Sequence, residues 1–145
     1  MIYFDAAYIA KCYLNEPGAE RVRELARTAE GLASCEIARV EFASTLKRHL
    51  REGHLTRREV KATLKEFGED ERNGVWQWFG ATSTLLEQTR QRVAGLPRAV
   101  VIRSIDALHL TCAALHGFRE VYTNDRHMLQ AARHFHVAGR NILDE

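Results

Sequence analysis

The apolar positions of this chain follow two spacings, which separate short strands from longer amphipathic helices. Brief apolar or alternating runs predict strands at residues 2–4, 31–35, 75–79, 121–123 and 141–143, the second and last of them faint. Repeats every three or four positions predict helices at residues 6–14, 17–29, 37–52, 57–67, 84–94, 105–115 and 126–134. Strands that alternate with helices predict an α/β fold with a parallel sheet.

Local signals place several helix boundaries. Thr56 with Glu59, and Thr84 with Glu87, have the spacing of a capping box at a helix start. Pro17 is expected to open the second helix, because the first turn needs no backbone N–H from that residue.

The helices at residues 37–52 and 57–67 are expected to form an antiparallel hairpin. The first of them has apolar residues on one face, at Val40, Ala43, Leu46 and Leu50. The strand at residues 75–79 carries both tryptophans, which we expect to pack in the core rather than to stack on bases.

Composition narrows the class of protein. The chain has 145 residues, 46% of them apolar, without repeats or a long linker, which predicts one domain over residues 1–145. Its net charge of +2 does not by itself indicate a nucleic-acid-binding protein. No membrane-spanning run and no basic secretory leader are present in the sequence, so a cytoplasmic protein is expected. Three cysteines without paired spacing argue against a zinc site.

One acid lies in an otherwise apolar helix. Asp106 falls in the first turn of the stretch 105–115, whose residues are apolar on nearly every side, as in a buried helix. A buried carboxylate needs a partner. Asp106 could interact with the helix dipole, pair with Arg103, or bind another positive group. His109, one turn later, is expected either to hydrogen-bond Asp106 or to pack within the helix.

Two further acids follow predicted strands. Asp5 ends the first strand, and Asp125 follows the strand at residues 121–123. Functional sites in parallel sheets lie beyond the carboxyl ends of the strands, where the strand order reverses. Acids at these positions are also common helix N-caps. Because Asp5, Asp106 and Asp125 show the pattern together, a shared site is the stronger interpretation.

Clustered carboxylates predict a divalent cation. Two carboxylates about 4 Å apart repel by on the order of 4 kcal/mol at an effective dielectric of about 20. Several such pairs would offset much of a domain's stability of about 5–15 kcal/mol. Either protons or a cation must relieve this repulsion, and an all-oxygen site suits Mg²⁺ or Mn²⁺. Such a site favours metal-assisted hydrolysis of a phosphodiester.

Four fragments in order resemble a known family. They are Ile2-Tyr3-Phe4-Asp5 followed by Tyr13-Leu14-Asn15-Glu16-Pro17-Gly18, then Arg39-Val40-Glu41-Phe42-Ala43, Ile105-Asp106-Ala107-Leu108-His109-Leu110 and Tyr122-Thr123-Asn124-Asp125. Together they resemble the PIN-domain ribonucleases, specifically the small VapC-like toxins of type II toxin–antitoxin systems. The resemblance covers essentially the whole chain.

The resemblance implies a three-layer α/β/α fold with about five short parallel strands, and a Mg²⁺- or Mn²⁺-dependent endoribonuclease that acts as a toxin. Asp5, Asp106 and Asp125 would bind the metal, Glu41 would complete the catalytic acids, and Thr123 would supply a supporting hydroxyl. Glu41 rests on the resemblance alone, since a solvated glutamate is ordinary at its position. The family also implies an RNA substrate, an antitoxin partner and a homodimer.

One position departs from the family pattern. Ala7 stands where the family commonly has Ser or Thr, and the missing hydroxyl could weaken metal binding. The alternative function is therefore a catalytically weakened PIN-like domain that binds RNA or a protein without cleavage. A phospho-acceptor receiver domain is disfavoured, because no lysine follows Lys65. Lys11, Arg39 and Arg126 are candidates to contact an RNA backbone.

Overall fold

The computed structural model describes residues 1–144, which form one parallel sheet with helices between its strands. The strands are β1 (Ile2–Phe4), β2 (Leu32–Cys35), β3 (Trp76–Phe79), β4 (Glu120–Tyr122) and β5 (Ala138–Arg140). The helices are α1 (Ala6–Tyr13), α2 (Ala19–Thr28), α3 (Ile37–Arg51), α4 (Arg57–Arg72), α5 (Ser83–Ala94), α6 (Ser104–Leu115) and α7 (Arg126–Ala131), and the 3₁₀ helix η1 (Ala132–Phe135) follows α7.

The strand order explains where the chain can build a site. The order is β3-β2-β1-β4-β5, and all neighbouring pairs are parallel. The chain grows from β1 toward β2 and β3, and later adds β4 and β5 on the other side. The order therefore reverses at the carboxyl ends of β1 and β4, where parallel sheets commonly bind ligands. The predicted α/β fold with five parallel strands is confirmed.

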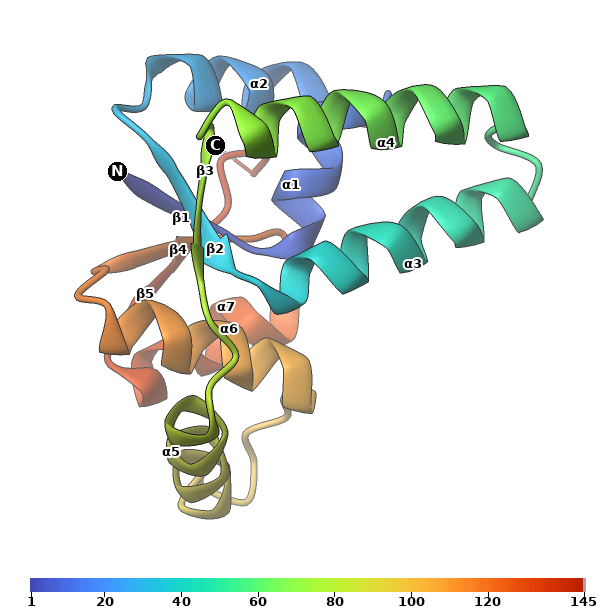
Figure 1. The fold of residues 1–145 in the computed structure, drawn as a ribbon. Coiled ribbons are helices and arrows are strands. Elements are labelled where there is room, and N and C mark those ends of the chain that lie inside the picture. The colour runs from blue at the N-terminus through green and yellow to red at the C-terminus, as the bar shows by residue number, and fades with distance from the viewer. Residues whose placement is uncertain (145) are drawn as a thin grey trace.

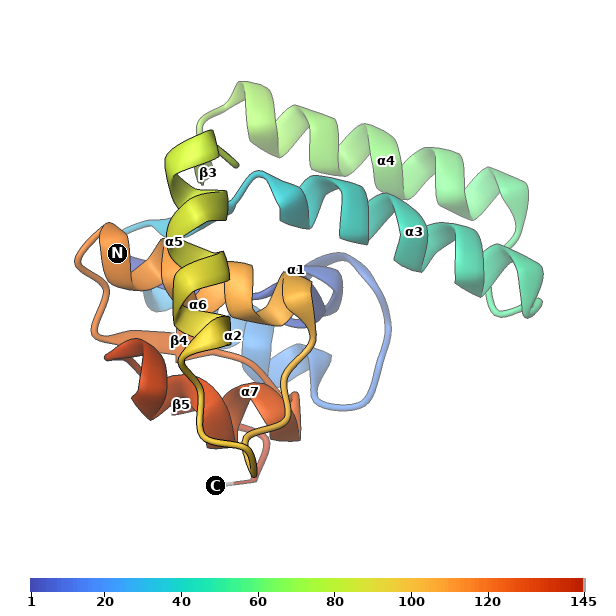
Figure 2. The ribbon, with the colours of Figure 1, turned by 90° about the horizontal axis from the view of Figure 1, so that it is seen from below.

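Two helical layers cover the sheet, as Figure 1 and the turned view in Figure 2 show. Successive residues of β1 face opposite layers: Tyr3 packs in the cluster with α6 and α7, and Phe4 packs in the cluster with α1 to α4. Both side chains are fully buried. This period of two gives each short strand two apolar faces, and the predicted three-layer architecture is confirmed.

The hairpin of α3 and α4 extends beyond the edge of the sheet (Figure 1). Thr56 caps α4 in a capping box with Glu59, as predicted. The buried face of α3 differs from the prediction, because Val40 is 61% exposed and the core residues are Ala38, Phe42 and Leu46. The predicted stripe shares only Leu46 with the core, since the large Phe42 ring sets which face turns inward.

Three local predictions are wrong. The second helix begins at Ala19, after a left-handed Gly18 at φ 79°, so Pro17 lies outside it. Thr82 rather than Thr84 caps α5. The last strand is three residues earlier than predicted, and Leu143 instead packs from a turn against Gly18.

Three further expectations concern the tryptophans, membrane spans and the number of domains. Trp76 is buried in the core, and the partly buried Trp78 ring stacks on it, as expected for core packing. None of the helices within residues 1–144 is long and apolar enough to cross a membrane. The one-domain prediction covered residues 1–145, and Glu145 lies outside the described residues.

Candidate active site

A pocket of about 260 Å³ lies at the carboxyl ends of β1 and β4 and is lined by all four predicted acids. Each of these four acids lies in, or directly before, a different helix. Its lining consists of Asp5, Ala6, Ala7, Glu41, Arg103, Asp106, His109, Asn124 and Asp125. The fold thus brings together residues that are up to 120 positions apart in the sequence, which is the difference between 125 and 5.

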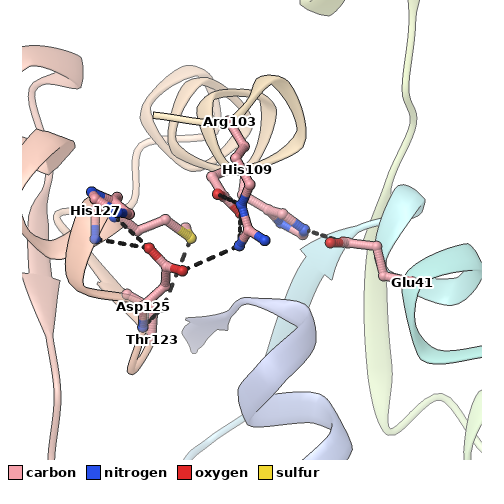
Figure 3. Close-up of polar contacts among 8 residues, drawn as sticks. Glu41, Arg103, His109, Thr123, Asp125 and His127 are labelled. Carbon is pink, nitrogen blue, oxygen red and sulfur yellow. Dashed lines mark hydrogen bonds and ion pairs between the residues drawn. The ribbon is translucent and has the colours of Figure 1, made fainter. Parts of the chain in front are cut away.

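Asp5 and Asp125 are both helix N-caps. An Asp5 carboxylate oxygen accepts from the Tyr8 backbone N–H at 2.8 Å at the start of α1. Asp125 accepts from the backbone N–H groups of His127 and Met128 at 2.8 and 2.9 Å at the start of α7 (Figure 3). The capping interpretation is therefore correct for both acids, and it is compatible with their place in the pocket. Capping fixes where each carboxylate lies.

Arg103 supplies the positive partner of Asp106. Its Nε lies 2.7 Å from Asp106 Oδ2, and its Nη2 lies 3.1 Å from Asp125 Oδ2. One guanidinium therefore joins an acid of α6 to the acid before α7. The Asp106 side chain is almost buried, whereas the Arg103 side chain is 72% exposed. The pairing with Arg103, one of the alternatives for Asp106, is thus observed.

Glu41 reaches the pocket from the second turn of α3. Its Oε2 lies 2.7 Å from Nε2 of His109, which extends from α6 (Figure 3). The carboxylate partner of His109 is therefore Glu41, rather than Asp106 as in one of the two expectations from the sequence. The Nδ1 atom of His109 lies 3.0 Å from the Tyr3 hydroxyl.

Burial dominates the electrostatics of the acids. It raises the pKa of Asp5 to about 6, although the Thr123 hydroxyl and the Tyr8 N–H oppose the shift. Burial also raises the pKa of Asp106, against the opposing effect of Arg103. Burial alone would lower the pKa of the His109 imidazole, but the hydrogen bond and charge of Glu41 outweigh it and raise that pKa. Burial therefore disfavours the ionised forms of Asp5 and Asp106, and their neighbours compensate for this only in part.

The residues expected to support the site or to contact RNA agree with the structure only in part. The Thr123 hydroxyl accepts from the Asp125 backbone N–H at 2.9 Å, which fits the supporting role. Ala7 lines the pocket and brings no hydroxyl to it. Lys11 is buried, and its Nζ bonds Glu16 and the Pro17 carbonyl, so it is unsuited to contact RNA. Arg39 pairs with Glu71 at 2.7 Å on the far side of α3, while Arg126 remains exposed.

The donor chemistry of the pocket fits a hard divalent cation, because its four acids offer only carboxylate oxygens. The Arg103 guanidinium is a stand-in for that charge, since it already binds Asp106 and Asp125. Within residues 1–144, no three His, Cys, Asp or Glu side chains converge closely enough to hold an ion in this conformation. A cation that used both Asp106 and Asp125 would therefore compete with the Arg103 guanidinium for them.

The sequence did not predict all the contacts of Arg103 and His109. The i, i+3 spacing of Arg103 and Asp106 indicated a pair, but nothing indicated that the same guanidinium also reaches Asp125. The contact between His109 and Glu41 joins two helices whose residues are 68 positions apart. A local pattern does not contain such a contact.

Three solved structures share this fold at low sequence identity. The toxin VapC20 of Mycobacterium tuberculosis, described as cleaving the sarcin–ricin loop, aligns with a TM-score of 0.71 and 16% identity, over 90% of this chain and 95% of that one. FitAcB of Neisseria gonorrhoeae aligns with a TM-score of 0.66 and 20% identity, over 97% of each chain. FitAB bound to an IR36 DNA fragment aligns with a TM-score of 0.62 and 19% identity, over 99% of this chain and 96% of that one.

Comparison with curated proteins finds no match. At these identities the structural similarities establish the fold alone. The family model for the PIN domain, in contrast, matches residues 2–134, which is most of the chain and includes all four acids of the pocket. The chain therefore belongs to the PIN-domain family.

Proposed function

We propose that the protein is a Mg²⁺- or Mn²⁺-dependent endoribonuclease that acts as the toxin of a toxin–antitoxin pair. The observation that carries the proposal is the single pocket lined by Asp5, Glu41, Asp106 and Asp125, in which two acids already share one positive group. PIN domains are typically nucleases, and the site lies where the strand order reverses.

Asp5, Asp106 and Asp125 would hold the cation. When bound, it would stabilise negative charge on the phosphodiester oxygens and lower the pKa of a water molecule. The protein's own residues position these groups: helix capping fixes Asp5 and Asp125, and the start of α6 presents Asp106. Glu41, which reaches the pocket from α3, would orient a water molecule or accept its proton.

Arg103 has a second use in this proposal. Once released from the two acids, its exposed guanidinium lies at the mouth of the pocket, where it can bind a phosphate of the RNA backbone. Arg126, at the start of α7, is a further exposed basic residue beside Asp125. These contacts recognise the backbone and not the base sequence.

The alternative function is a PIN-like domain that binds RNA or a protein without cleaving RNA. Two observations favour it: Ala7 brings no hydroxyl to the pocket, and Arg103 already neutralises part of the acidic charge. The four acids favour the enzyme, because a domain that only binds an anionic ligand has no need of them.

RNA cleavage distinguishes the two functions. Purified protein is incubated with total RNA in Mg²⁺ or Mn²⁺, with EDTA and Asp106→Asn as inactive controls. Asp144→Asn, an exposed acid near the C-terminus, is the matched substitution that should keep activity. Cleavage that survives both EDTA and Asp106→Asn overturns the metal mechanism. RNA binding without cleavage establishes the alternative.

The toxin assignment has its own test. Induced expression of the wild-type protein in a bacterial host should stop growth, and Asp106→Asn should not. An antitoxin partner and a homodimer belong to the same proposal, because both follow from the resemblance to VapC-like toxins. Growth arrest by Asp106→Asn as strong as that by the wild type would contradict toxicity through RNA cleavage.

A further inference from the structure

His109 is buried, yet both nitrogens of its ring are engaged by polar groups. It is 1% exposed. Nδ1 faces the Tyr3 hydroxyl at 3.0 Å, and Nε2 faces the Glu41 carboxylate at 2.7 Å. A line of polar contacts thus runs from the centre of the sheet to the acidic pocket.

The hydrogen-bond partners of His109 determine which of its ring nitrogens carries a hydrogen. The Cys35 backbone N–H donates to the Tyr3 hydroxyl oxygen at 2.9 Å, so the Tyr3 hydrogen is free to be donated to Nδ1 of His109. The Glu41 carboxylate only accepts hydrogen bonds. Nε2 must therefore carry a hydrogen and donate it to Glu41. A neutral ring with its hydrogen on Nδ1 would instead place the Nε2 lone pair against the carboxylate.

This donation holds in both charge states of the ring. In the imidazolium form, Nδ1 donates to the Tyr3 oxygen, and Nε2 still donates to Glu41. The contact is charge-assisted in either form, because the acceptor is a carboxylate, and its length of 2.7 Å is typical of such bonds.

The hydrogen bond from His109 also restricts the orientation of the Glu41 side chain. Glu41 is the one pocket acid that neither caps a helix nor pairs with Arg103, and its side chain is only 25% exposed. Among residues 1–144, His109 is the hydrogen-bond donor to its carboxylate. A glutamate has three rotatable bonds, so without this donor the carboxylate would have several directions available.

We propose that His109 is a positioning residue: its Nε2–H holds the Glu41 carboxylate in the acidic pocket, and Tyr3 fixes which nitrogen carries the hydrogen. Helix α6 thereby contributes one acid directly, Asp106, and orients a second acid through His109 three residues later. The catalytic consequence rests on the proposed endoribonuclease function, whereas the hydrogen-bond arrangement does not.

Two near-isosteric substitutions separate this role from simple packing. In His109→Gln, the side-chain amide nitrogen reaches about as far as Nε2 and keeps a donor for Glu41. In His109→Asn, the shorter amide reaches only the Nδ1 position and leaves Glu41 without its donor. Both remove the ring and disturb the core, so thermal unfolding of each variant measures the packing loss that they share.

We expect kcat of RNA cleavage to fall about ten- to a hundredfold in His109→Asn, with KM little changed, and to be largely retained in His109→Gln. Adding His109→Asn to Glu41→Gln should cause little further loss, because His109 then has no carboxylate left to orient. Equal losses in the Gln and Asn variants, or additive losses in the double variant, would overturn the proposal.

A spectroscopic measurement keeps the inference testable if no variant, including the wild type, cleaves RNA. Long-range ¹H–¹⁵N correlation spectra should show His109 protonated at Nε2 in the metal-free protein. A crystal structure of His109→Asn should show the Glu41 carboxylate turned away from its wild-type position. A His109 ring protonated only at Nδ1, or a Glu41 carboxylate that does not move in His109→Asn, overturns the positioning role. If both results are as expected but the wild-type protein does not cleave RNA, only the proposed function is overturned.

Discussion

Asp5 is the residue at which burial has the clearest consequence. Burial raises its pKa from 3.8 to about 6, so the folded protein binds this proton more tightly than the unfolded chain does. The stabilisation by protonated Asp5 is therefore present below about pH 4 and is lost as the pH rises through about 6. A shift of this size corresponds to at most about 3 kcal/mol.

We therefore expect Asp5→Asn to stabilise the metal-free protein at pH 7, with a gain that shrinks toward pH 4. Asparagine keeps an oxygen to accept from the Tyr8 N–H, so the helix cap is preserved. Urea unfolding in EDTA between pH 4 and 7 measures the difference. Glu30→Gln, an almost fully exposed acid, is the control and should show no such dependence. A variant less stable than the wild type at pH 7 would refute the desolvation argument.

We expect Arg103 to limit how readily the pocket accepts a cation. Its guanidinium bonds the carboxylates of Asp106 and Asp125, so a cation that binds both acids would compete with it. We expect Arg103→Met to bind Mn²⁺ about tenfold more tightly or better, since removal of one competing positive charge strengthens the field of the acids. Isothermal titration calorimetry measures the affinity.

Arg126→Met is the matched control, because Arg126 is exposed and does not line the pocket. Its Mn²⁺ affinity should remain close to that of the wild type. Weaker Mn²⁺ binding by Arg103→Met would mean that the guanidinium assists the metal rather than competes with it.

At the scale of elements, helix capping gives a direct comparison of two threonines. The Thr82 hydroxyl accepts from the Leu85 backbone N–H at 3.2 Å and caps α5, whereas Thr84 lies inside the helix. We expect Thr82→Ala to lower the free energy of unfolding by about 1 kcal/mol, and Thr84→Ala to change it by less than about half as much. Chemical denaturation of both variants measures this, and the reverse order would place the cap at Thr84.

The sequence contained most of the elements but not all of their boundaries. Thr84 with Glu87 has the right spacing for a capping box, but Glu87 bonds Arg90 and Gln91 on the helix surface instead. The strand β5 offers no apolar run to detect. It carries Gly139, where a Cβ would lie 2.9 Å from Leu129 Cα, so close packing against α7 excludes a larger side chain.

At the scale of the whole molecule, the site depends on the order of the strands. Asp5 and Asp125 were predictable because both follow parallel strands, and Asp106 was predictable because it interrupts an apolar helix. Glu41 was predictable only from the family resemblance, because a solvated glutamate is ordinary at its position on a long helix and it enters the pocket only through the packing of α3 against the body. Its partner His109 depends on the same tertiary contact.

The three-layer fold therefore assigns different roles to residues of similar chemistry. Two acids cap helices, one pairs with an arginine, and one bonds a buried histidine. The whole arrangement holds four carboxylates around one pocket in a chain of otherwise ordinary charge. A cation that binds them together would relieve the desolvation that these acids carry when metal-free.

The proposed metal centre is tested most directly by anomalous X-ray diffraction from crystals of the wild-type protein grown with Mn²⁺. We expect an anomalous peak in the pocket, within bonding distance of Asp5, Asp106 and Asp125, with the Arg103 guanidinium moved away from Asp106 and Asp125. A pocket without such a peak at saturating Mn²⁺, with Arg103 still bound to both acids, would contradict the proposed metal centre.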